Sequence, residues 1–379
     1  MTAPLSTLDT PAALLDERKV AANIARMQAR MNALGVAFRP HVKTAKCVEV
    51  ARLQRAAGAQ GITVSTLKEA QAFFGAGFDD ILYAVSIIGS RLPQVQALRE
   101  QGCGLKITVD SLEAAQAVAA YGQAHGHSFD VLIELDTDGH RAGVLPHSAA
   151  LLEIGQALHT GGAQLTGVMT HAGASYNLYT ESELVAFAEQ ERSGCVTAAQ
   201  RLREAGLPCA IVSVGSTPTA LSAAHLQGVT EVRAGVYVFQ DLVMAGVGVC
   251  TPEDIALSVL GTVIGHQPDK GWVLIDAGWM ALSRDRGTQA QPVDRKYGLV
   301  CAEDGTALPE WIVSAANQEH GIISRVDGAA DASLRQHFPL GSRLRVLPNH
   351  ACATGAQFDR YHLVKEDGTV QVWPRFGGW

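Results

Sequence analysis

A chain of 379 residues is longer than one ordinary hydrophobic core, so we expect one large domain and one smaller domain. Hydrophobic residues make up 47% of the sequence and charged residues 18%, a composition that excludes a disordered chain. The net charge of −7 comes without a basic run, which excludes nucleic acid as a partner, and no apolar run approaches the ~20 residues of a membrane span, so no membrane partner is expected either.

The N-terminal residues and the cysteines indicate where the protein works. The first ten residues have neither a basic start nor an apolar stretch, so we expect no signal peptide. The seven cysteines are odd in number and include no CxxC pair. This pattern is typical of a reduced, cytoplasmic enzyme and not of a disulfide framework.

Two elements are expected before residue 36. Leu8–Asp16 is apolar but contains a proline, which suits an edge strand. The helix predicted next has apolar residues at helical spacing, namely Val20, Ile24, Met27, Met31 and Leu34. Gly35 ends that helix.

Strand and helix patterns then alternate regularly. Eight strands are predicted, at Val36–Phe38, Gly61–Val64, Ile81–Val85, Leu105–Val109, Phe129–Leu135, Leu165–Thr170, Ala210–Val214 and Glu231–Arg233. Eight βα units predict an α/β fold of the TIM (β/α)8 barrel type, with a doubly wound open sheet as the alternative. No GxGxxG follows the first strand, which disfavours a dinucleotide-binding version of that sheet.

The pattern changes after about residue 250. Ile255–His266 and Trp272–Ile275 flank a Pro-Asp-Lys-Gly turn and predict a hairpin, and Trp311–Ala315 and Ser342–Leu347 predict further short strands. We therefore expect a barrel domain over residues 8–250 and a β-rich domain over residues 251–379. The N-terminal strand within residues 1–15 is a candidate to join the second domain.

Lys43 is the first candidate catalytic residue. It lies in the loop after the first predicted strand, which Pro40 ends. Functional groups of a barrel sit on the loops after its strands, and a desolvated lysine amine there can form a Schiff base with an aldehyde. The alternative is a solvated surface lysine.

The loops after later strands carry further polar candidates. Gly215, Ser216 and Thr217 directly precede a helix, where backbone N–H groups and two hydroxyls can hold a phosphate, although an ordinary capped helix start explains them too. The other loop residues that we single out are Arg141, Tyr176, Gly235 and Tyr237. Arg141 can bind a phenolic oxygen or a carboxylate, or be solvated.

His350 and Cys352 are candidate metal ligands. On an extended segment residues i and i+2 point to the same face, so both side chains could bind one ion. Two ligands alone are a weak signal for zinc.

Five motifs carry a resemblance to a known family: Arg39–Thr44, Asp138–Gly143, Val214–Thr219, Glu231–Tyr237 and Pro348–Cys352. With them the chain resembles the metal-dependent D-threonine aldolase/D-serine dehydratase family, whose barrel is shared with alanine racemase. The resemblance covers most of the chain and includes the members that dehydrate D-threo-3-hydroxyaspartate. It implies a barrel that binds pyridoxal 5′-phosphate (PLP), a C-terminal β domain and a homodimer.

The resemblance also implies roles for the candidate residues. Lys43 would carry PLP as a Schiff base and act as the base at the substrate's α-carbon, and Arg141 would face the phenolic oxygen. The other cofactor-binding residues would be Tyr176, Gly215, Ser216, Thr217, Gly235 and Tyr237, with the last five around the phosphate. His350 and Cys352 would bind a divalent metal ion (Zn, Mn or Mg).

Two reactions on D-β-hydroxy amino acids fit this family. A dehydratase, a lyase, would convert D-threo-3-hydroxyaspartate, D-serine or a D-threonine-like substrate to a 2-oxo acid and ammonia. An aldolase would instead release glycine and an aldehyde. In this family a His-x-Cys pair resembles the dehydratases and His-x-Asp the aldolases, so Cys352 favours the dehydratase. A PLP-binding protein without turnover and an alanine racemase are disfavoured, because neither calls for the metal pair.

Overall fold

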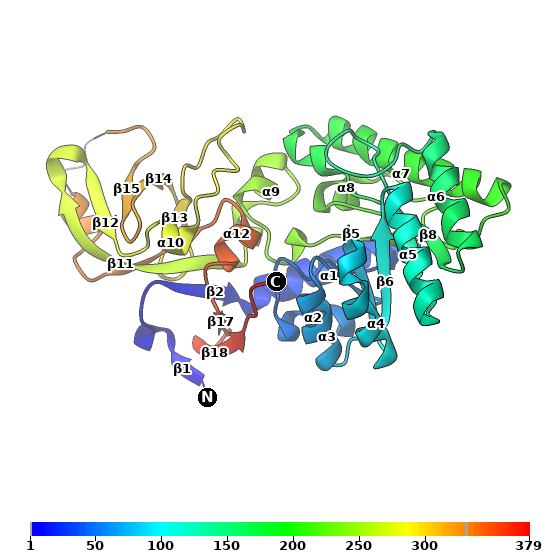
Figure 1. The fold of residues 1–379 in the computed structure, drawn as a ribbon. Helices are drawn as coiled ribbons and strands as arrows, with labels where there is room; N and C mark the ends of the chain where they lie inside the picture. Colours follow the sequence, from blue (N-terminus) through cyan, green and yellow to red (C-terminus); the bar gives the residue numbers. More distant parts are fainter. Residues whose placement is uncertain (1, 330–332) are drawn as a thin grey trace. The chain divides into compact units, whose positions relative to one another are not determined.

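The computed structural model describes residues 2–329 and 333–379 of the chain (Figure 1). The chain divides into two compact units. We call residues 26–43, 50–235 and 378–379 the barrel unit. We call the rest, residues up to 25, 44–49 and 236–377, the sheet unit. Each unit is described by itself.

The barrel unit contains one parallel sheet of eight strands, in the order β3-β10-β9-β8-β7-β6-β5-β4. The strands are β3 (Ala37–Phe38), β4 (Ile62–Val64), β5 (Asp80–Ser86), β6 (Gly104–Val109), β7 (Asp130–Leu135), β8 (Gln164–Thr170), β9 (Ile211–Val214) and β10 (Glu231–Val232). All eight strands predicted from the sequence are confirmed within two residues at each end. Their buried faces are rich in Val, Ile and Leu, as expected of parallel strands covered on both sides.

A single bridge closes the barrel between its terminal strands β3 and β4. Pro40 follows β3 and has no N–H, so the ladder cannot continue through it. Its carbonyl instead accepts from Thr63 N at 2.8 Å, Val42 N donates to Thr63 O at 2.9 Å, and His41 pairs with Thr63 in parallel. This closure contradicts the open-sheet alternative and fixes the backbone directly before Lys43.

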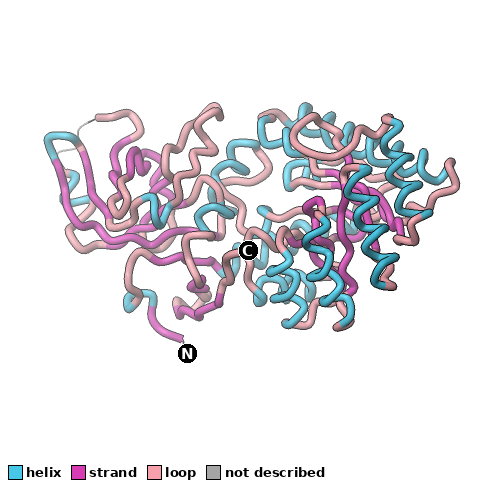
Figure 2. Tube along the Cα trace, in the orientation of Figure 1, coloured by secondary structure: helices cyan, strands magenta, loops and turns pink. Residues whose placement is uncertain are grey.

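The helices between the strands follow the predicted alternation (Figure 2). They are α2 (Val48–Ala56), α3 (Leu67–Gly75), α4 (Leu92–Glu100), α5 (Leu112–His125), α6 (Ala149–Thr160), α7 (Glu181–Glu204) and α8 (Thr217–Ser222); α1 (Glu17–Ala33) precedes β3. Side chains cap several of them: Thr66, Ser111 and Ser216 each accept a bond from the backbone N–H three residues on. Thr180 and Glu183 form a reciprocal capping box at the start of α7.

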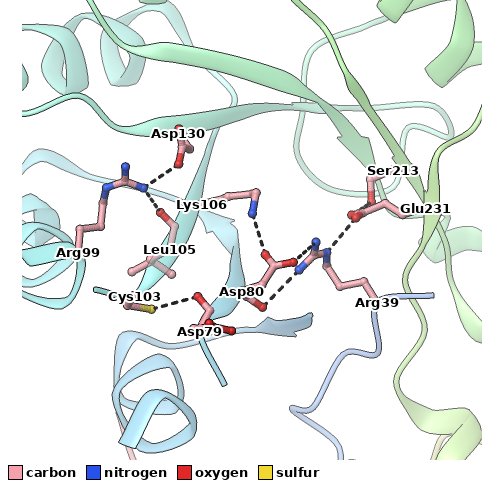
Figure 3. A network of polar contacts seen from close by, with 10 residues as sticks. All are labelled: Arg39, Asp79, Asp80, Arg99, Cys103, Leu105, Lys106, Asp130, Ser213 and Glu231. Atoms are coloured by element: carbon pink, nitrogen blue, oxygen red, sulfur yellow. Dashed lines mark hydrogen bonds and ion pairs between the residues drawn. The ribbon is translucent and has the colours of Figure 1, made fainter. Parts of the chain in front are cut away.

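A network of ion pairs links four strands of the barrel unit (Figure 3). Arg39 donates from Nε to Glu231 at 2.9 Å and from a terminal nitrogen to Asp80 at 2.9 Å, and Lys106 pairs with Asp80 at 2.7 Å. The guanidinium passes over Gly61, where a Cβ would lie 2.1 Å from one of its nitrogens. Only glycine therefore permits this crossing.

The sheet unit is built on ten strands in the order β1-β18-β17-β2-β11-β12-β15-β14-β13-β16, and a further β11–β16 pairing closes six of them into a barrel. The strands are β1 (Thr2–Pro4), β2 (Ala12–Asp16), β11 (Leu257–Gln267), β12 (Trp272–Ile275), β13 (Leu299–Ala302), β14 (Ala307–Ala316), β15 (Gly321–Arg325), β16 (Arg343–Leu347), β17 (Arg360–Val364) and β18 (Thr369–Pro374). The core of the closed part includes Val259, Ile275, Val313, Ile323 and Val346.

Short helices complete the described structure. The α-helices of the sheet unit are α9 (Leu242–Val247), α10 (Trp279–Leu282), α11 (Leu334–His337) and α12 (Ala351–Gly355). The 3-10 helices are η1 (Leu5–Thr7), η2 (Gly89–Arg91), η3 (Gly173–Asn177), η4 (Val236–Val238), η5 (Pro252–Asp254) and η6 (Pro268–Lys270). No helix in the described part of the chain is long and apolar enough to cross a membrane.

Two expectations for the sheet unit can be compared with its strands. The hairpin is confirmed, because β11 and β12 pair antiparallel around η6. The prediction of an edge strand is wrong, because β2 pairs with β11 on one side and with β17 on the other. Pro11 lies before the first residue of β2, so its missing N–H interrupts neither ladder.

We predict that Glu231→Ala lowers the free energy of unfolding by about 3 kcal/mol, because Arg39 stays buried with one of its two carboxylates gone. Urea unfolding of the variant and the parent measures the difference. The control is Glu310→Ala, which removes an exposed partner of Arg325 and should cost less than about 1 kcal/mol. Equal losses in the two variants would contradict the role given to the Arg39 network.

Candidate active site

His171 is the residue around which the predicted barrel-unit candidates gather. It follows β8, and its Nδ1 lies 3.0 Å from Gly215 O. Because a carbonyl only accepts, Nδ1 carries the hydrogen and Nε2 is left as an acceptor. Its ring centroid lies 6.3 Å from that of Tyr176. Burial, and after it the charge of Lys43, lower the pKa of His171 to about 3, so the ring is neutral.

A second imidazole, that of the half-buried His41, lies two residues before Lys43. Burial lowers the pKa of His41 well below its ordinary value, and the positive charges of Lys43 and Arg233 add to the effect. Its Nδ1 is buried and has no hydrogen-bond partner among the described residues. Lys43 itself is half-buried. The amine of Lys43 thus has two uncharged imidazoles near it.

Arg233 is a candidate residue to which the sequence analysis gave no role. It follows β10, is 3% exposed, and donates from Nε to Ser213 Oγ at 2.8 Å and from a terminal nitrogen to Thr170 O. Ser213 Oγ donates in turn to Glu231 at 2.8 Å, so Arg233 is connected to the network of Arg39. The sequence signal for Arg233 was its position within the Glu231–Tyr237 motif. The sequence did not reveal that its side chain points inward.

The predicted phosphate loop has a fixed geometry. Gly215 has φ +138°, and a Cβ there would lie 2.0 Å from Arg233 O, so the position requires glycine. Ser216 Oγ accepts from Thr219 N at 3.2 Å and lies 2.8 Å from Ser175 Oγ. This hydroxyl is therefore already engaged as a helix cap.

Glu191 supports the same loop from α7. One carboxylate oxygen accepts from Gly215 N at 2.8 Å and from Ala172 N at 3.2 Å, which ties the loops after β9 and β8 together. Burial raises the pKa of Glu191 to about 7, although bonds to Thr219 and Gly215 oppose the shift. No sequence signal marked this residue, because it lies within a long helix.

Arg141 and Gly235 complete the predicted residues of the barrel unit. Arg141 lies in the loop after β7 with 51% of its side chain exposed, and its nearest carboxylate oxygen, on Glu134, is 3.8 Å away. Its charge is one of those that lower the pKa of His171. Gly235 is half-buried in the loop after β10.

The remaining predicted residues, Tyr237, His350 and Cys352, belong to the sheet unit. Tyr237 is 1% exposed within η4. His350 is the N-cap of α12, and Cys352 lies in the first turn of that helix. The expectation of an extended segment was therefore wrong, since the extended chain ends at His350.

The side chains of His350 and Cys352 are nevertheless close to each other. Burial opposes protonation of His350, but its bonds to Asp285 and Cys352 prevail and raise its pKa to about 11. His350 Nδ1 lies 2.6 Å from Asp285 Oδ2, which leaves Nε2 directed elsewhere. Thr44 follows Lys43 in the sequence, and its Oγ1 lies 3.2 Å from Cys352 Sγ.

A buried carboxylate holds the backbone of this pair. Asp241 accepts from Ala351 N and from Met244 N, each at 2.9 Å, so it connects the starts of α12 and α9. Among the described residues there is no group of three or more His, Cys, Asp or Glu side chains arranged to hold a metal. A metal bound by the pair would complete its coordination with water or substrate.

Comparison with known proteins identifies the family. The alanine racemase N-terminal domain model matches residues 15–242, and the putative serine dehydratase domain model matches residues 256–364. The D-threo-3-hydroxyaspartate dehydratase of Delftia sp. (strain HT23) is 63% identical over 376 residues, 99% of each chain. The chain belongs to the D-serine dehydratase/D-threonine aldolase family.

Other relatives are consistent with this family. The solved structure of the Delftia protein has a TM-score of 0.99 and covers 99% of this chain and 100% of its own. The D-serine dehydratase of Dictyostelium discoideum is 30% identical, over 97% of this chain and 96% of its own. The D-threonine aldolase of an Arthrobacter species is also 30% identical, over 98% and 93%. A cysteine-to-alanine variant of D-threo-3-hydroxyaspartate dehydratase is described in a metal-free form.

The family implies PLP, and the barrel unit has groups that fit it. Lys43 supplies an amine whose charge acts on two neutral imidazoles, and His41 Nδ1 is a buried ring nitrogen without a hydrogen-bond partner among the described residues. The N-terminus of α8 supplies backbone N–H groups of the kind that bind a phosphate, and Thr217 adds a hydroxyl there. The donor chemistry of the His350–Cys352 pair, an imidazole nitrogen and a thiol, likewise fits a divalent metal such as zinc.

We predict that Asp285→Asn weakens metal binding by about 10–100-fold, because the carboxylate fixes the orientation and basicity of the His350 ring. Competition with a chromophoric chelator measures the metal dissociation constant. PLP absorbance should not change. Asp327→Asn, at an exposed carboxylate paired with Arg325, is the control and should leave metal affinity at the parent value. An unchanged dissociation constant in Asp285→Asn would remove Asp285 from this role.

Proposed function

We propose that this protein is a PLP- and divalent-metal-dependent dehydratase that converts D-threo-3-hydroxyaspartate to a 2-oxo acid and ammonia. The observation that carries the proposal is the 63% identity, over 99% of both chains, to a D-threo-3-hydroxyaspartate dehydratase. A chain with this identity over this length is expected to keep the reaction type. D-Serine and D-threonine are further candidate substrates.

PLP and the divalent metal ion would have different roles in the reaction. When bound, PLP withdraws electrons from the substrate's α-carbon, and a divalent ion polarises the β-hydroxyl so that it can leave. Lys43 Nζ is the base that takes the α-proton. His41 and His171 stay uncharged near neutral pH, so neither competes as a second cation beside the amine.

The proposed metal ligands have hydrogen-bond partners within the sheet unit. Thr44 Oγ1 lies 3.2 Å from Cys352 Sγ. His350 would bind through Nε2, since Nδ1 faces Asp285. Cys352 would bind as a thiolate, for which Thr44 Oγ1 is a hydrogen-bond donor.

Around the cofactor, each proposed role has a structural basis. Thr217 and the backbone at the start of α8 would hold the phosphate. Gly215 and Ser216 would fix this loop, since Gly215 permits the close approach of Arg233 O and Ser216 caps the helix. Arg141 would bind the phenolic oxygen; its exposed side chain has no partner closer than Glu134 at 3.8 Å among the described carboxylates. We keep Tyr176, Gly235 and Tyr237 as further cofactor-binding residues on the strength of the family motifs.

An aldolase that cleaves 3-hydroxyaspartate or D-threonine is the second candidate. Full-length relatives with aldolase names support it. Both reactions start from the same substrate class and use the same lysine. Cys352, where the aldolases resembled by this chain carry aspartate, favours the dehydratase.

We also propose a homodimer in a reducing, cytoplasmic compartment. The dimer follows from the resemblance to the family. The compartment is supported by the seven cysteines, which all lie in the described part of the chain and form no disulfide there.

A product assay with and without a chelator tests the function. From D-threo-3-hydroxyaspartate we expect oxaloacetate and ammonia, and glycine with glyoxylate would instead indicate the aldolase. Chelation should stop elimination and leave PLP absorbance unchanged, because the ion acts on the hydroxyl and not on the cofactor. Added divalent metal should restore the rate. Full-rate dehydration by chelated enzyme would contradict the metal's role.

We predict that Lys43→Ala abolishes turnover and the visible absorbance of lysine-bound PLP, because no other amine replaces its Schiff base. Lys68→Ala, on the exposed face of α3, is the control and should keep both. Borohydride reduction followed by peptide mapping checks the attachment site. A reducible adduct and activity in Lys43→Ala would show that the lysine was misassigned.

A further inference from the structure

The sheet unit contains a polar cavity that shares no residue with the candidate active site. Its volume is about 240 Å³. It lies where the end of β2, the start of α1, the start of β11, the turn between β13 and β14, and β16 meet. Its polar lining residues are Asp16, Lys19, Ser258, Asp304, Thr306 and Arg345.

Arg345 is the unusual residue of this cavity. It is only 6% exposed, and its Nε is buried without a hydrogen-bond partner. Among the described residues, no hydrogen bond or ion pair to its guanidinium is found. Other arginines of the unit differ: Arg343 donates to Leu5 O at 2.8 Å and pairs with Glu303, and Arg375 donates to Tyr361 Oη at 3.1 Å. A buried guanidinium with unmade bonds is costly unless something else accepts from it.

The two carboxylates of the cavity do not fill this role. Asp16 Oδ1 accepts from Lys19 N at 3.0 Å and so caps α1, and Asp304 Oδ1 accepts from Thr306 N at 2.8 Å in its own turn. Burial lowers the pKa of Arg345, and the charges of Asp16 and Asp304 offset this only in part. The Arg345 guanidinium therefore lacks hydrogen-bond acceptors among the described residues, and its positive charge is only partly compensated.

A second cation faces the same space. Lys19 Nζ donates to Ile255 O at 3.3 Å, which uses one of its three hydrogens. The hydroxyls of Ser258 and Thr306 also line the cavity. Two cations and two hydroxyls from separate elements of the unit therefore line the cavity.

We propose that this cavity binds a small oxyanion, a carboxylate or a phosphate, whose oxygens accept hydrogen bonds from Arg345 and Lys19. The cavity volume of about 240 Å³ has room for such an anion. A bound anion would connect α1, β16 and the turn at Asp304, so it should stabilise the sheet unit. This site is independent of the proposed reaction, and its failure would leave the dehydratase proposal untouched.

Calorimetric titration of the PLP-loaded enzyme with inorganic phosphate, and separately with acetate, tests the site. PLP then occupies its own phosphate site, and the preferred anion identifies the class of ligand. We expect saturable binding of at least one anion. Arg345→Met should weaken it at least tenfold, since it removes charge-assisted bonds at similar side-chain volume, and Lys19→Met should weaken it severalfold.

Lys270→Met, at an exposed cation of the same unit in η6, is the matched control and should bind the anion like the parent. Lys19 lies on the cavity wall and is half-buried, so its variant keeps the test valid if Arg345→Met does not fold. Thermal unfolding should show a midpoint raised by the anion in the parent and control only. Absence of saturable binding to the parent, or equal binding by the parent and both cavity variants, would overturn the proposal.

Discussion

The ion pairs of Arg39 are the interaction on which the barrel unit and its candidate site depend. Arg39 lies where the β3 ladder stops, because the next residue, Pro40, has no N–H. Glu231 and Asp80 hold its guanidinium from strands on either side of the closure, both at 2.9 Å. The loop that follows can therefore return to Thr63 and present Lys43 at a defined place, instead of leaving a gap between the terminal strands.

From Glu231 the same polar chain continues inward through Ser213 to Arg233. Arg233 contributes to the low pKa of both His41 and His171, while burial is the main cause of each shift. The neutral state of these imidazoles is thus a product of packing. In the sheet unit the pKa of His350 shifts in the opposite direction. Its carboxylate and sulfur partners outweigh burial and raise that pKa.

Much of the architecture follows from local pattern. Each of the eight strands is a short apolar run bounded by a helix pattern, and that pattern depends on neighbouring residues alone, which is why it could be predicted. The hairpin of β11 and β12 was predictable for the same reason, because turn residues separate two apolar runs. The strand pattern placed Lys43 and Gly215 on loops after barrel strands, since functional groups of a barrel sit on those loops.

The sequence by itself determined the number of barrel strands, their alternation with helices, and which loops carry candidate residues. Only the tertiary structure decided the contacts between residues far apart in the chain. It placed β2 inside the ten-stranded sheet and began α12 directly after His350. It also connected Glu191 and Arg233 to the candidates of the barrel unit and paired Asp285 with His350. These features depend on strand register and on burial of charged groups among distant partners. Strand register and the burial of charged groups produce no periodic pattern or fixed residue spacing in the sequence. They could therefore not be inferred from the sequence alone.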